Sequence, residues 1–277
     1  MLVRHVAIVS ETKKISSSAL MRVSAALSKQ ATRDFEPIWN IKTNVHSFAR
    51  LQDVPLGYWP VIIRDDIPDP NAAGYHTDRN GSPFALVRYD AGWSLTTSHE
   101  VLEMLCDPFG NRTIAGPSLK TGQGRVEYLV EVCDPCEDAP FGYTVNNVLV
   151  SDFYTPHFFD PVKAADVRYS FSGKITEPRQ VLENGYISWY DPVSGEWWQL
   201  TLFGTKQINK LGKADTSFGS VREWIDAQTP TPLETRGGLK ASQAVTASAT
   251  TATQAAKSST ASARALRQHI KRIIAKP

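Results

Sequence analysis

Apolar positions near the N-terminus follow first a strand period and then a helix period. Residues 3–9, "VRHVAIV", form a short and nearly continuous apolar run, which is typical of a buried strand. Four later apolar positions share one helix face: Leu20, Val23, Leu27 and Ala31. Serines precede this second run and are favourable N-cap residues. We therefore predict a strand followed by a helix.

The next segments have the patterns of strands. Residues 44–51, "NVHSFARL", alternate weakly, and residues 58–66, "YWPVIIRDD", are a short apolar run that ends in acids. An Asn80-Gly81 pair, which favours a two-residue hairpin turn, precedes the run "FALVRY" at residues 84–89. These segments predict two single strands and a hairpin.

A second helix is predicted within residues 94–108, "SLTTSHEVLEMLCDP". A threonine or serine at positions 96–98 can cap its N-terminus. The helix is expected to continue to about Leu105, because Pro108 disfavours helical backbone just before it.

Strand-forming side chains dominate much of the following chain. Residues 125–138 are apolar with interleaved acids, and residues 142–161 are rich in aromatic and β-branched side chains. Residues 185–204, "GYISWYDPVSGEWWQLTLFG", contain two aromatic runs that flank a stretch of turn-forming residues. We predict an aromatic β-hairpin there.

The C-terminal part of the chain differs in composition and charge. Glu234 is the last acidic residue, and residues 235–277 carry eight Lys or Arg, a charge of +8. The whole chain has a net charge of +2, so the remainder carries −6. Residues 227–260 are predicted to form a disordered Ala/Thr/Ser-rich linker, because so few large apolar side chains bury too little surface to order a chain.

Residues 261–277 form a basic amphipathic terminal segment. Its large apolar side chains share one helix face: Leu266, Ile270, Ile273 and Ile274. This pattern favours docking onto a protein partner, an anionic membrane surface or a nucleic acid, although the tail could also be a solubilising extension. A helix this short is marginal in water, so it is expected to become helical only when bound.

The remaining composition disfavours several classes of protein. Cys106, Cys133 and Cys136 are a small and odd-numbered set, which argues against a disulfide scaffold. No stretch reaches the roughly 20 apolar residues that a membrane span needs. The N-terminal apolar run is short and interrupted by charge, unlike a secretory signal. The expected location is the cytoplasm by default, with signal-independent export left open.

Candidate chemistry lies on the helix predicted within residues 94–108. His99 and Glu103 are four residues apart, so they project from the same helix face and can bind one ion. Zinc accepts imidazole nitrogen or carboxylate oxygen, and two anionic ligands would also suit calcium or manganese. Glu100 lies beside such an ion, where a general base would hold a water molecule.

A third ligand must come from outside this helix. The best source is the acid-rich segment 125–138, in which Glu131 and Asp134 are three residues apart. Spacing alone does not choose between these two carboxylates. His76 and His157 are more remote candidates, as ligands or as contacts for substrate.

An ordinary amphipathic helix explains part of the same pattern. Its apolar residues form a core face, and acids on the opposite face are common in proteins without metals. The upstream strand "FALVRY" and the downstream acid cluster favour the metal site over this simpler interpretation.

The order of the predicted elements and two motifs resemble the zincin metallopeptidases. The first motif is H-E-x-x-E-x-x-x-D-P, which begins at His99 and ends at Pro108, and the second is the later E-x-x-D of Glu131 and Asp134. Together they resemble a variant found in a group of bacterial zincin-like proteins. The resemblance covers about residues 1–165.

The resemblance implies a role for each residue of the motifs. His99 and Glu103 would bind the metal, Glu100 would be the general base, and Glu131 or Asp134 would complete the ligand set. It also implies that "FALVRY" is an edge strand above the active-site helix, where it would hold an extended peptide substrate.

We therefore expect an α+β fold with four parts. A zincin-like metal-binding domain with a mixed sheet and an active-site helix would occupy residues 1–165, and a β-hairpin-containing extension would occupy residues 166–226. The disordered linker 227–260 and the basic segment 261–277 would follow.

The expected function is metal-dependent hydrolysis of a peptide or protein substrate. A metal-bound water, with zinc as the leading metal, would be activated by Glu100. The alternative is a non-catalytic binding or structural protein that is stabilised by a metal and carries a basic docking tail.

Overall fold

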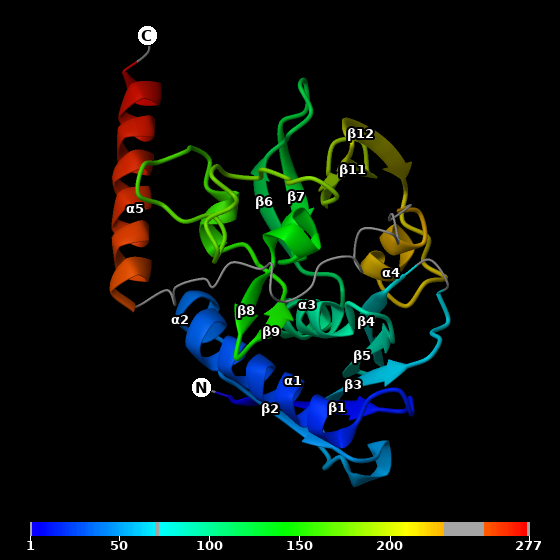
Figure 1. Cartoon of the computed structure of the whole chain (residues 1–277). Coiled ribbons are helices and arrows are strands. Elements are labelled where there is room, and N and C mark those ends of the chain that lie inside the picture. Colours follow the sequence, from blue (N-terminus) through cyan, green and yellow to red (C-terminus); the bar gives the residue numbers. More distant parts are fainter. Residues whose placement is uncertain (1, 70–71, 230–251, 276–277) are drawn as a thin grey trace.

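The computed structural model describes residues 2–69, 72–229 and 252–275, and its architecture is α+β, as predicted (Figure 1). The first sheet has five strands: β1 (Arg4–Ser10), β2 (Thr43–Phe48), β3 (Tyr58–Arg64), β4 (Gly74–Arg79) and β5 (Ser82–Arg88). Their spatial order is β2-β1-β3-β5-β4. Strand β4 runs antiparallel to β5 and the other pairs are parallel, so the sheet is mixed.

The predicted hairpin connects β4 to β5 through Asn80 and Gly81. Both residues have positive φ angles, 54° and 76°, as a two-residue turn of this kind requires. Arg79 pairs with Ser82 across the turn. The local turn chemistry was therefore sufficient to predict this connection.

The expected edge position of "FALVRY" is wrong. These residues form most of β5, which lies between β3 and β4, and the edge strand is β4. Ala85, Leu86 and Val87 are all buried, as in a strand with neighbours on both sides. The more polar β4, "GYHTDR", takes the edge.

Helix α1 (Ser17–Lys29) covers one end of the first sheet. Ser16 caps it, since its side-chain oxygen accepts a hydrogen bond from Ala19 N at 3.2 Å. The chain continues as a π-helical segment (Gln30–Phe35) and a short α-helix, α2 (Glu36–Trp39). Asn40, in the left-handed conformation, ends this run.

Helix α3 (Trp93–Cys106) lies on the same face of the sheet as α1. Apolar side chains of both helices share one core cluster with Val6, Ile8 and Val61 of the sheet. Among the described residues, the opposite face carries a smaller cluster, to which Ile62 and Leu86 belong. The main core therefore fills the space between the sheet, the two helices and the rest of the chain.

The N-cap of α3 differs from the prediction. The helix begins one turn earlier, after Gly92, and the cap position supplies no side-chain hydrogen bond. Thr97 and Ser98 lie inside the helix, where their hydroxyls donate to Trp93 O and Leu95 O. Such bonds to the preceding turn satisfy the hydroxyls without capping.

A second sheet of five strands follows: β6 (Thr113–Pro117), β7 (Arg125–Leu129), β10 (Tyr186–Asp191), β11 (Glu196–Phe203) and β12 (Thr205–Gly212). It is antiparallel throughout, in the order β12-β11-β10-β7-β6. The predicted aromatic hairpin is β10–β11. The sheet includes strands from both sides of the boundary predicted at residue 165, and that boundary stays a prediction.

Among the residues that the structure describes, several short elements connect the longer strands and helices. A small hairpin consists of β8 (Tyr143–Val145) and β9 (Val148–Val150), and β9 packs on α3. Four 3₁₀ turns occur at Leu51–Asp53, Asp134–Cys136, Ala139–Phe141 and Pro156–Phe159. The short helix α4 (Val221–Asp226) follows the second sheet.

Helix α5 (Ala252–Ile274) contains the predicted basic segment but begins well before residue 261. Residues 230–251, most of the linker predicted to be disordered, lie outside the described residues. The remainder of that linker from residue 252 is helical, in contrast to the predicted disorder, and the domain boundary at 260 stays a prediction. Alanine, which favours helix, is frequent in this part.

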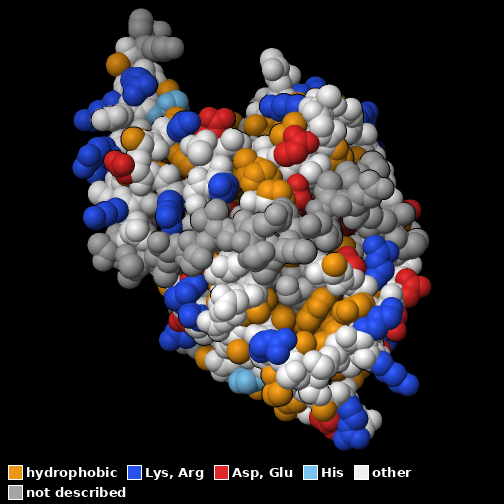
Figure 2. Space-filling view, in the orientation of Figure 1, with side chains coloured by type: hydrophobic (Ala, Val, Ile, Leu, Met, Phe, Trp, Pro, Cys, Tyr) orange, Lys and Arg blue, Asp and Glu red, His pale blue; other side chains and the backbone are white. Residues whose placement is uncertain are grey.

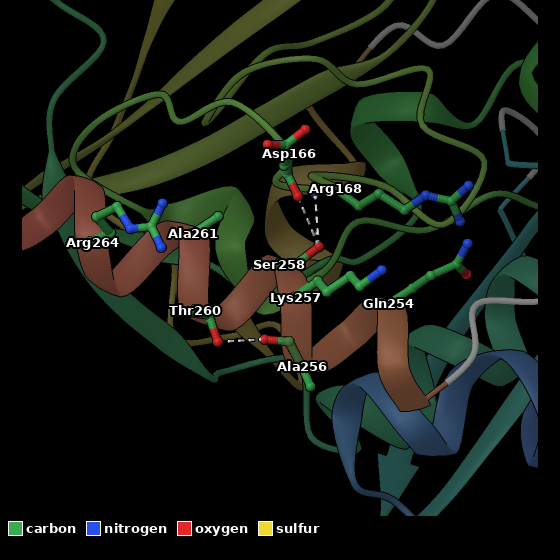
Figure 3. Close-up of a pocket in the computed structure, with 9 residues that line it drawn as sticks. All are labelled: Asp166, Arg168, Gln254, Ala256, Lys257, Ser258, Thr260, Ala261 and Arg264. Atoms are coloured by element: carbon green, nitrogen blue, oxygen red, sulfur yellow. Dashed lines mark hydrogen bonds between the residues drawn. The ribbon is translucent and has the colours of Figure 1, made fainter.

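The first half of α5 contacts the body of the protein. Ser258 is buried, and its hydroxyl accepts from Arg168 N at 3.3 Å and donates to Asp166 O at 3.4 Å (Figure 3). Ser262 donates to Asp160 at 2.6 Å. The expectation that this helix forms only on a partner is therefore corrected, because the chain's own body supplies contacts.

Among the described residues, no helix is both long and apolar enough to cross a bilayer.

Candidate metal centre

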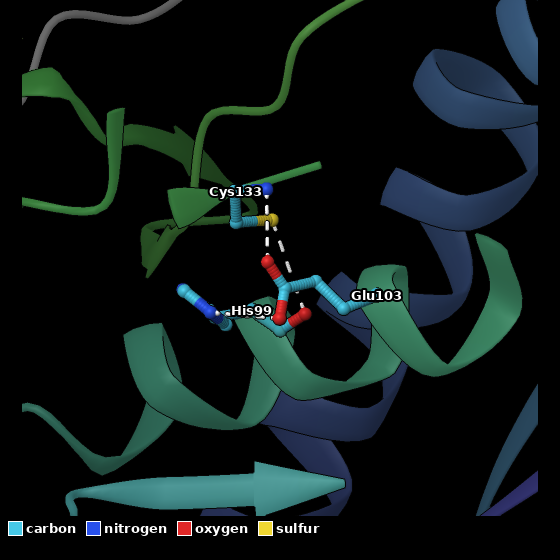
Figure 4. Close-up of side chains that lie close together, drawn as sticks. All are labelled: His99, Glu103 and Cys133. Carbon is cyan, nitrogen blue, oxygen red and sulfur yellow. Dashed lines mark hydrogen bonds and ion pairs between the residues drawn. The ribbon is translucent and has the colours of Figure 1, made fainter. Parts of the chain in front are cut away.

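Helix α3 places His99 and Glu103 against each other in the interior. Nε2 of His99 lies 3.1 Å from Oε2 of Glu103, and both residues are buried (Figure 4). The other Glu103 oxygen, Oε1, accepts a hydrogen bond from Cys133 N at 3.1 Å. The helical spacing of four residues produces this pair, as the sequence predicts.

The chain after β7 brings the two downstream acids to the same place. It leaves the sheet at Leu129 and turns into the 3₁₀ segment that begins at Asp134. Oδ1 of Asp134 lies 3.3 Å from Nε2 of His99. One carboxylate oxygen from each of Glu103, Glu131 and Asp134 also lies within 4.8 Å of the other two. All four residues predicted as ligands therefore converge.

Glu100, the predicted base, faces the edge strand β4. Its carboxylate is fully buried, and neither oxygen has a hydrogen-bond partner among the described residues. Gly74 of β4 makes this approach possible, since a Cβ there would lie 2.9 Å from Oε1 of Glu100 and 2.8 Å from Cγ2 of Thr96. An unpartnered buried carboxylate is costly, so a proton, a cation or a ligand is needed beside it.

His76 of β4 lies in the same cluster. Its Nε2 is 2.9 Å from the carbonyl oxygen of Asp107, which can only accept, so Nε2 carries the hydrogen. Nδ1 then faces carboxylates, 3.6 Å from Oε2 of Glu100 and 3.9 Å from Oε2 of Glu103. Metal-binding histidines commonly use a backbone carbonyl in this way to fix the ring.

The other remote candidate, His157, lies elsewhere. Its Nδ1 is 3.1 Å from Asp160, and its Nε2 is 3.4 Å from the Ser259 hydroxyl of α5. The carboxylate of Asp107, the aspartate of the D-P motif, accepts from Arg112 N at 2.7 Å and so shapes the turn after α3. Neither side chain contacts the cluster directly.

Arg222 of α4 is the principal site residue that sequence reasoning missed. Its Nη1 lies 2.7 Å from Oε2 of Glu103 and 3.5 Å from Oδ2 of Asp134, and it donates to Glu131. Its Nε lies 3.1 Å from Asp226. The spacing of Arg222 and Asp226 on one helix turn was visible in the sequence, but nothing indicated that the pair is buried beside α3.

Local contacts hold α4 in this position. Ser220 caps the helix by accepting from Glu223 N at 3.1 Å, and Arg222 N donates to Gly110 O at 3.1 Å. Gly110 has a φ of 61°, and a Cβ there would lie 2.8 Å from the Ser220 hydroxyl oxygen. The loop after α3 and the start of α4 therefore pack closely enough to insert the guanidinium among the acids.

Burial and charge shift the protonation of the cluster in both directions. Burial alone would lower the pKa of His99, but the charge of Glu103 and the hydrogen bond with Asp134 raise it well above its usual value. Burial opposes the ionised form of Glu103, yet Arg222 and His99 lower its pKa well below the usual range. Burial raises the pKa of Glu131 well above the usual range, and Arg222 only partly offsets this.

The cluster has more negative than positive groups. Three of its four buried carboxylates, those of Glu103, Glu131 and Asp134, contact the guanidinium of Arg222, and the fourth, Glu100, lies beside His76. Burial favours the neutral form of Glu131, so with a neutral His99, as a metal ligand must be, the other three carboxylates exceed the charge of Arg222 by two. Buried charges need partners, so the donor set fits one divalent cation.

The donor atoms of the cluster are nitrogen and oxygen. Burial raises the pKa of the Cys133 thiol well above its usual value, so this group stays protonated and is a poor ligand. Its Sγ lies 3.9 Å from His99 O, as a weak donor to that carbonyl (Figure 4). Imidazole with carboxylates suits zinc, and an oxygen-rich set also suits manganese or calcium.

A cavity of about 340 Å³ opens beside the cluster. It lies between the edge strand, which contributes Tyr75 and His76, and the region of α4, which contributes Phe218, Glu223 and Asp226. His76 therefore connects this cavity to the buried acids. A ligand in the cavity would lie along β4 and would contact His76, whose ring separates it from Glu100.

No protein-family model, curated protein or solved structure matches this chain. Assignment of a function therefore depends on the chemistry of the cluster. The resemblance to zincins, which depends on the two motifs and on the order of the predicted elements, stays a prediction.

Proposed function

We propose that the protein is a metal-dependent peptide hydrolase of zincin type. The proposal depends chiefly on one observation: Nε2 of His99 lies within 3.1 Å and 3.3 Å of carboxylate oxygens from Glu103 and Asp134. These groups come from separate segments and lie in an interior with excess negative charge. His99, Glu103 and Asp134 would hold the ion, and Glu131 would keep its ion pair with Arg222.

Glu100 would be the general base. The ion, when bound, would polarise the substrate carbonyl and make a water molecule more acidic. Glu100 is adjacent to His99 and has two unpartnered oxygens, so it can accept a proton from the attacking water and pass it to the leaving nitrogen. Burial by Gly74 and Thr96 would keep bulk water from this carboxylate.

Strand β4 would bind the substrate backbone. Among the described strands it pairs with β5 on one side only, so its other edge is open to an extended peptide. The cavity lined by Tyr75 and His76 lies along this strand. A peptide added there would contact His76, and hydrolysis would require the site to open so that the peptide reaches Glu100.

Elemental analysis tests the metal part of this proposal. The protein should contain about one equivalent of a divalent ion, most readily zinc, per chain. His99→Ala and Glu103→Ala should lose most of it, whereas Glu100→Gln should keep it, because a base is not a ligand. Glu127→Gln, at an exposed glutamate of β7, is the matched control. Equal metal content in all of these proteins would remove the site from consideration.

Cleavage of a peptide library tests the catalytic part. Glu100→Gln keeps the size of the side chain but removes the base, and general-base catalysis commonly contributes about 10²–10⁴-fold. Chelator-sensitive cleavage should fall by that factor while metal content and melting temperature stay close to wild type. A cleavage rate that the substitution leaves unchanged would contradict the role of Glu100.

The observation on Arg222 supports a second candidate function. Its guanidinium contacts Glu103, Glu131 and Asp134, so the cluster also suits a non-catalytic binding or structural protein in which ions stabilise the fold. In that case the wild type should show no chelator-sensitive cleavage. Chelation should lower the melting temperature, because an ion that binds only the folded state stabilises it.

A further inference from the structure

We propose that α5 binds an anionic lipid surface through an exposed apolar stripe. The stripe consists of Leu266, Ile270, Ile273 and Ile274, and it shares no residue with the candidate metal centre. It lies on the C-terminal half of the helix, which extends past the neighbouring loops at the upper left of Figure 1.

The two halves of α5 have different contacts. In the first half, Ser258 and Ser262 hydrogen-bond to the loop that contains Asp160, Asp166 and Arg168. Small side chains on this side let the helix approach the body closely. In the second half, the exposed fractions of the stripe increase along the chain, from 38% at Leu266 to 45%, 58% and 76% at the three isoleucines.

Four large aliphatic side chains on one exposed helix face need a partner. Each isoleucine that leaves water for an apolar environment stabilises the bound state. Isolated exposed apolar residues are common, but a continuous stripe of them on one helix indicates an interaction surface. No part of the chain that the structure describes covers this stripe, so we look for an external partner.

The charges around the stripe determine the sign of that partner. Residues of α5 include five cations and no acid: Lys257, Arg264, Arg267, Lys271 and Arg272. Figure 2 shows Lys and Arg side chains gathered along α5 at the left edge of the molecule. A basic helix with a separate apolar face is the pattern of helices that lie in the headgroup region of a bilayer.

An anionic bilayer would contact both the apolar stripe and the cations of α5. A nucleic acid or a second copy of the chain would satisfy only one of these two features. A nucleic acid would attract the cations but would leave the isoleucines in water. A second copy of the chain could cover the stripe, but it would bring together two helices that carry no acid. A lipid surface offers negative headgroups at the depth of the arginines and acyl chains at the depth of the isoleucines.

Co-sedimentation of the full chain with vesicles tests this inference. Vesicles of phosphatidylcholine that contain phosphatidylglycerol should bind the protein, and phosphatidylcholine vesicles should bind it far more weakly. Removing the stripe by Ile270→Ser with Ile273→Ser should weaken binding by at least about tenfold. Leu56→Ser, at a fully exposed leucine of the body, should have no effect and is the matched control.

A charge variant tests the same surface without changing the stripe. Arg267→Gln with Lys271→Gln keeps residues that favour helix, and binding should weaken by about fivefold for each cation removed. Added salt should release the wild type from the vesicles. Far-ultraviolet circular dichroism should report unchanged helix in both variants without lipid.

Four results would overturn the inference. They are equal binding to both kinds of vesicle, unchanged binding of both variants, a lipid-independent dimer that Ile270→Ser with Ile273→Ser abolishes, and binding to DNA fragments that the same isoleucine changes weaken. The third result would assign the stripe to a second copy of the chain. The fourth would assign it to a nucleic acid.

Discussion

Helices α3 and α5 both carry several charged side chains, but they place them in opposite environments. In α3, His99, Glu100 and Glu103 are buried. In α5, Arg267 and Lys271 are exposed to solvent. A buried charge requires specific partners at short distances, whereas an exposed charge is stabilised by water and stays available to an external partner. Charged side chains therefore have different consequences in the two helices.

The strongest test of this difference compares two arginines. Arg222→Ala should lower the free energy of unfolding by about 3–5 kcal/mol, because it leaves buried carboxylates without a counter-charge. Arg267→Ala, on the exposed side of α5, should change it by less than about 0.5 kcal/mol. Urea denaturation of both variants measures the two effects. Similar values would mean that the cluster around Arg222 is solvated, contrary to its burial.

Substitution of the two acids after β7 distinguishes a metal ligand from a residue that pairs with Arg222. Asp134 contacts His99 and is proposed as a ligand, so Asp134→Asn should weaken metal binding by more than about 100-fold. Glu131 mainly pairs with Arg222, so Glu131→Gln should weaken it by about 10–100-fold. Competition with a coloured chelator measures both affinities. A larger loss for Glu131→Gln would exchange the two roles.

The protonation of Asp226, in the buried region, is expected to make the stability of the protein depend on pH. Burial, only partly offset by Arg222, raises the pKa of this carboxyl to about 6. Between about pH 4 and about pH 6 the folded protein therefore holds a proton that the unfolded chain has released. Stability should fall with rising pH across this range, by about 1.4 kcal/mol per unit at most.

Asp226→Asn is the comparison for this pH dependence. The amide cannot ionise, so the variant should lack that part of the decline, as measured by urea denaturation at several pH values. Identical pH profiles for the two proteins would show that the carboxyl ionises as freely in the folded chain as in the unfolded one.

The smallest expected effect concerns the attachment of α5. Ser258→Ala removes the hydroxyl that bonds to the 166–168 backbone, and one such bond contributes about 0.5–1.5 kcal/mol. Amide hydrogen exchange in the first half of α5 should become faster, with little change in α3. Thr260→Ala, at an exposed neighbour whose hydroxyl bonds to Ala256 O within α5, is the control. Unchanged exchange would mean that other contacts hold the helix.

Local patterns were sufficient to predict most elements of the fold. The run at residues 3–9, the Asn80-Gly81 turn and the aromatic hairpin all depend on neighbours in sequence, and all occur. The order of strands in a sheet does not depend on neighbours. "FALVRY" was therefore predicted as a strand correctly but was given the edge position that β4 occupies.

The candidate site also contains residues that local sequence patterns predict and residues that only the fold brings there. His99 and Glu103 follow from helix geometry, and the proximity of Glu131 and Asp134 was expected from their motif. The position of His76 beside Glu100 required knowledge of the fold, because it depends on how the edge strand β4 packs against α3. Arg222 follows Glu103 by more than a hundred residues, and no local pattern marks a single arginine as buried.

All three cysteines provide internal reporters of how the protein opens. Cys106, Cys133 and Cys136 are free and buried, and burial raises the pKa of each thiol well above its usual value. A thiol-modifying reagent can therefore react with them only when the surrounding structure opens. Since Cys133 lies against His99 and Glu103, its labelling rate would measure local opening of the cluster without any engineered probe.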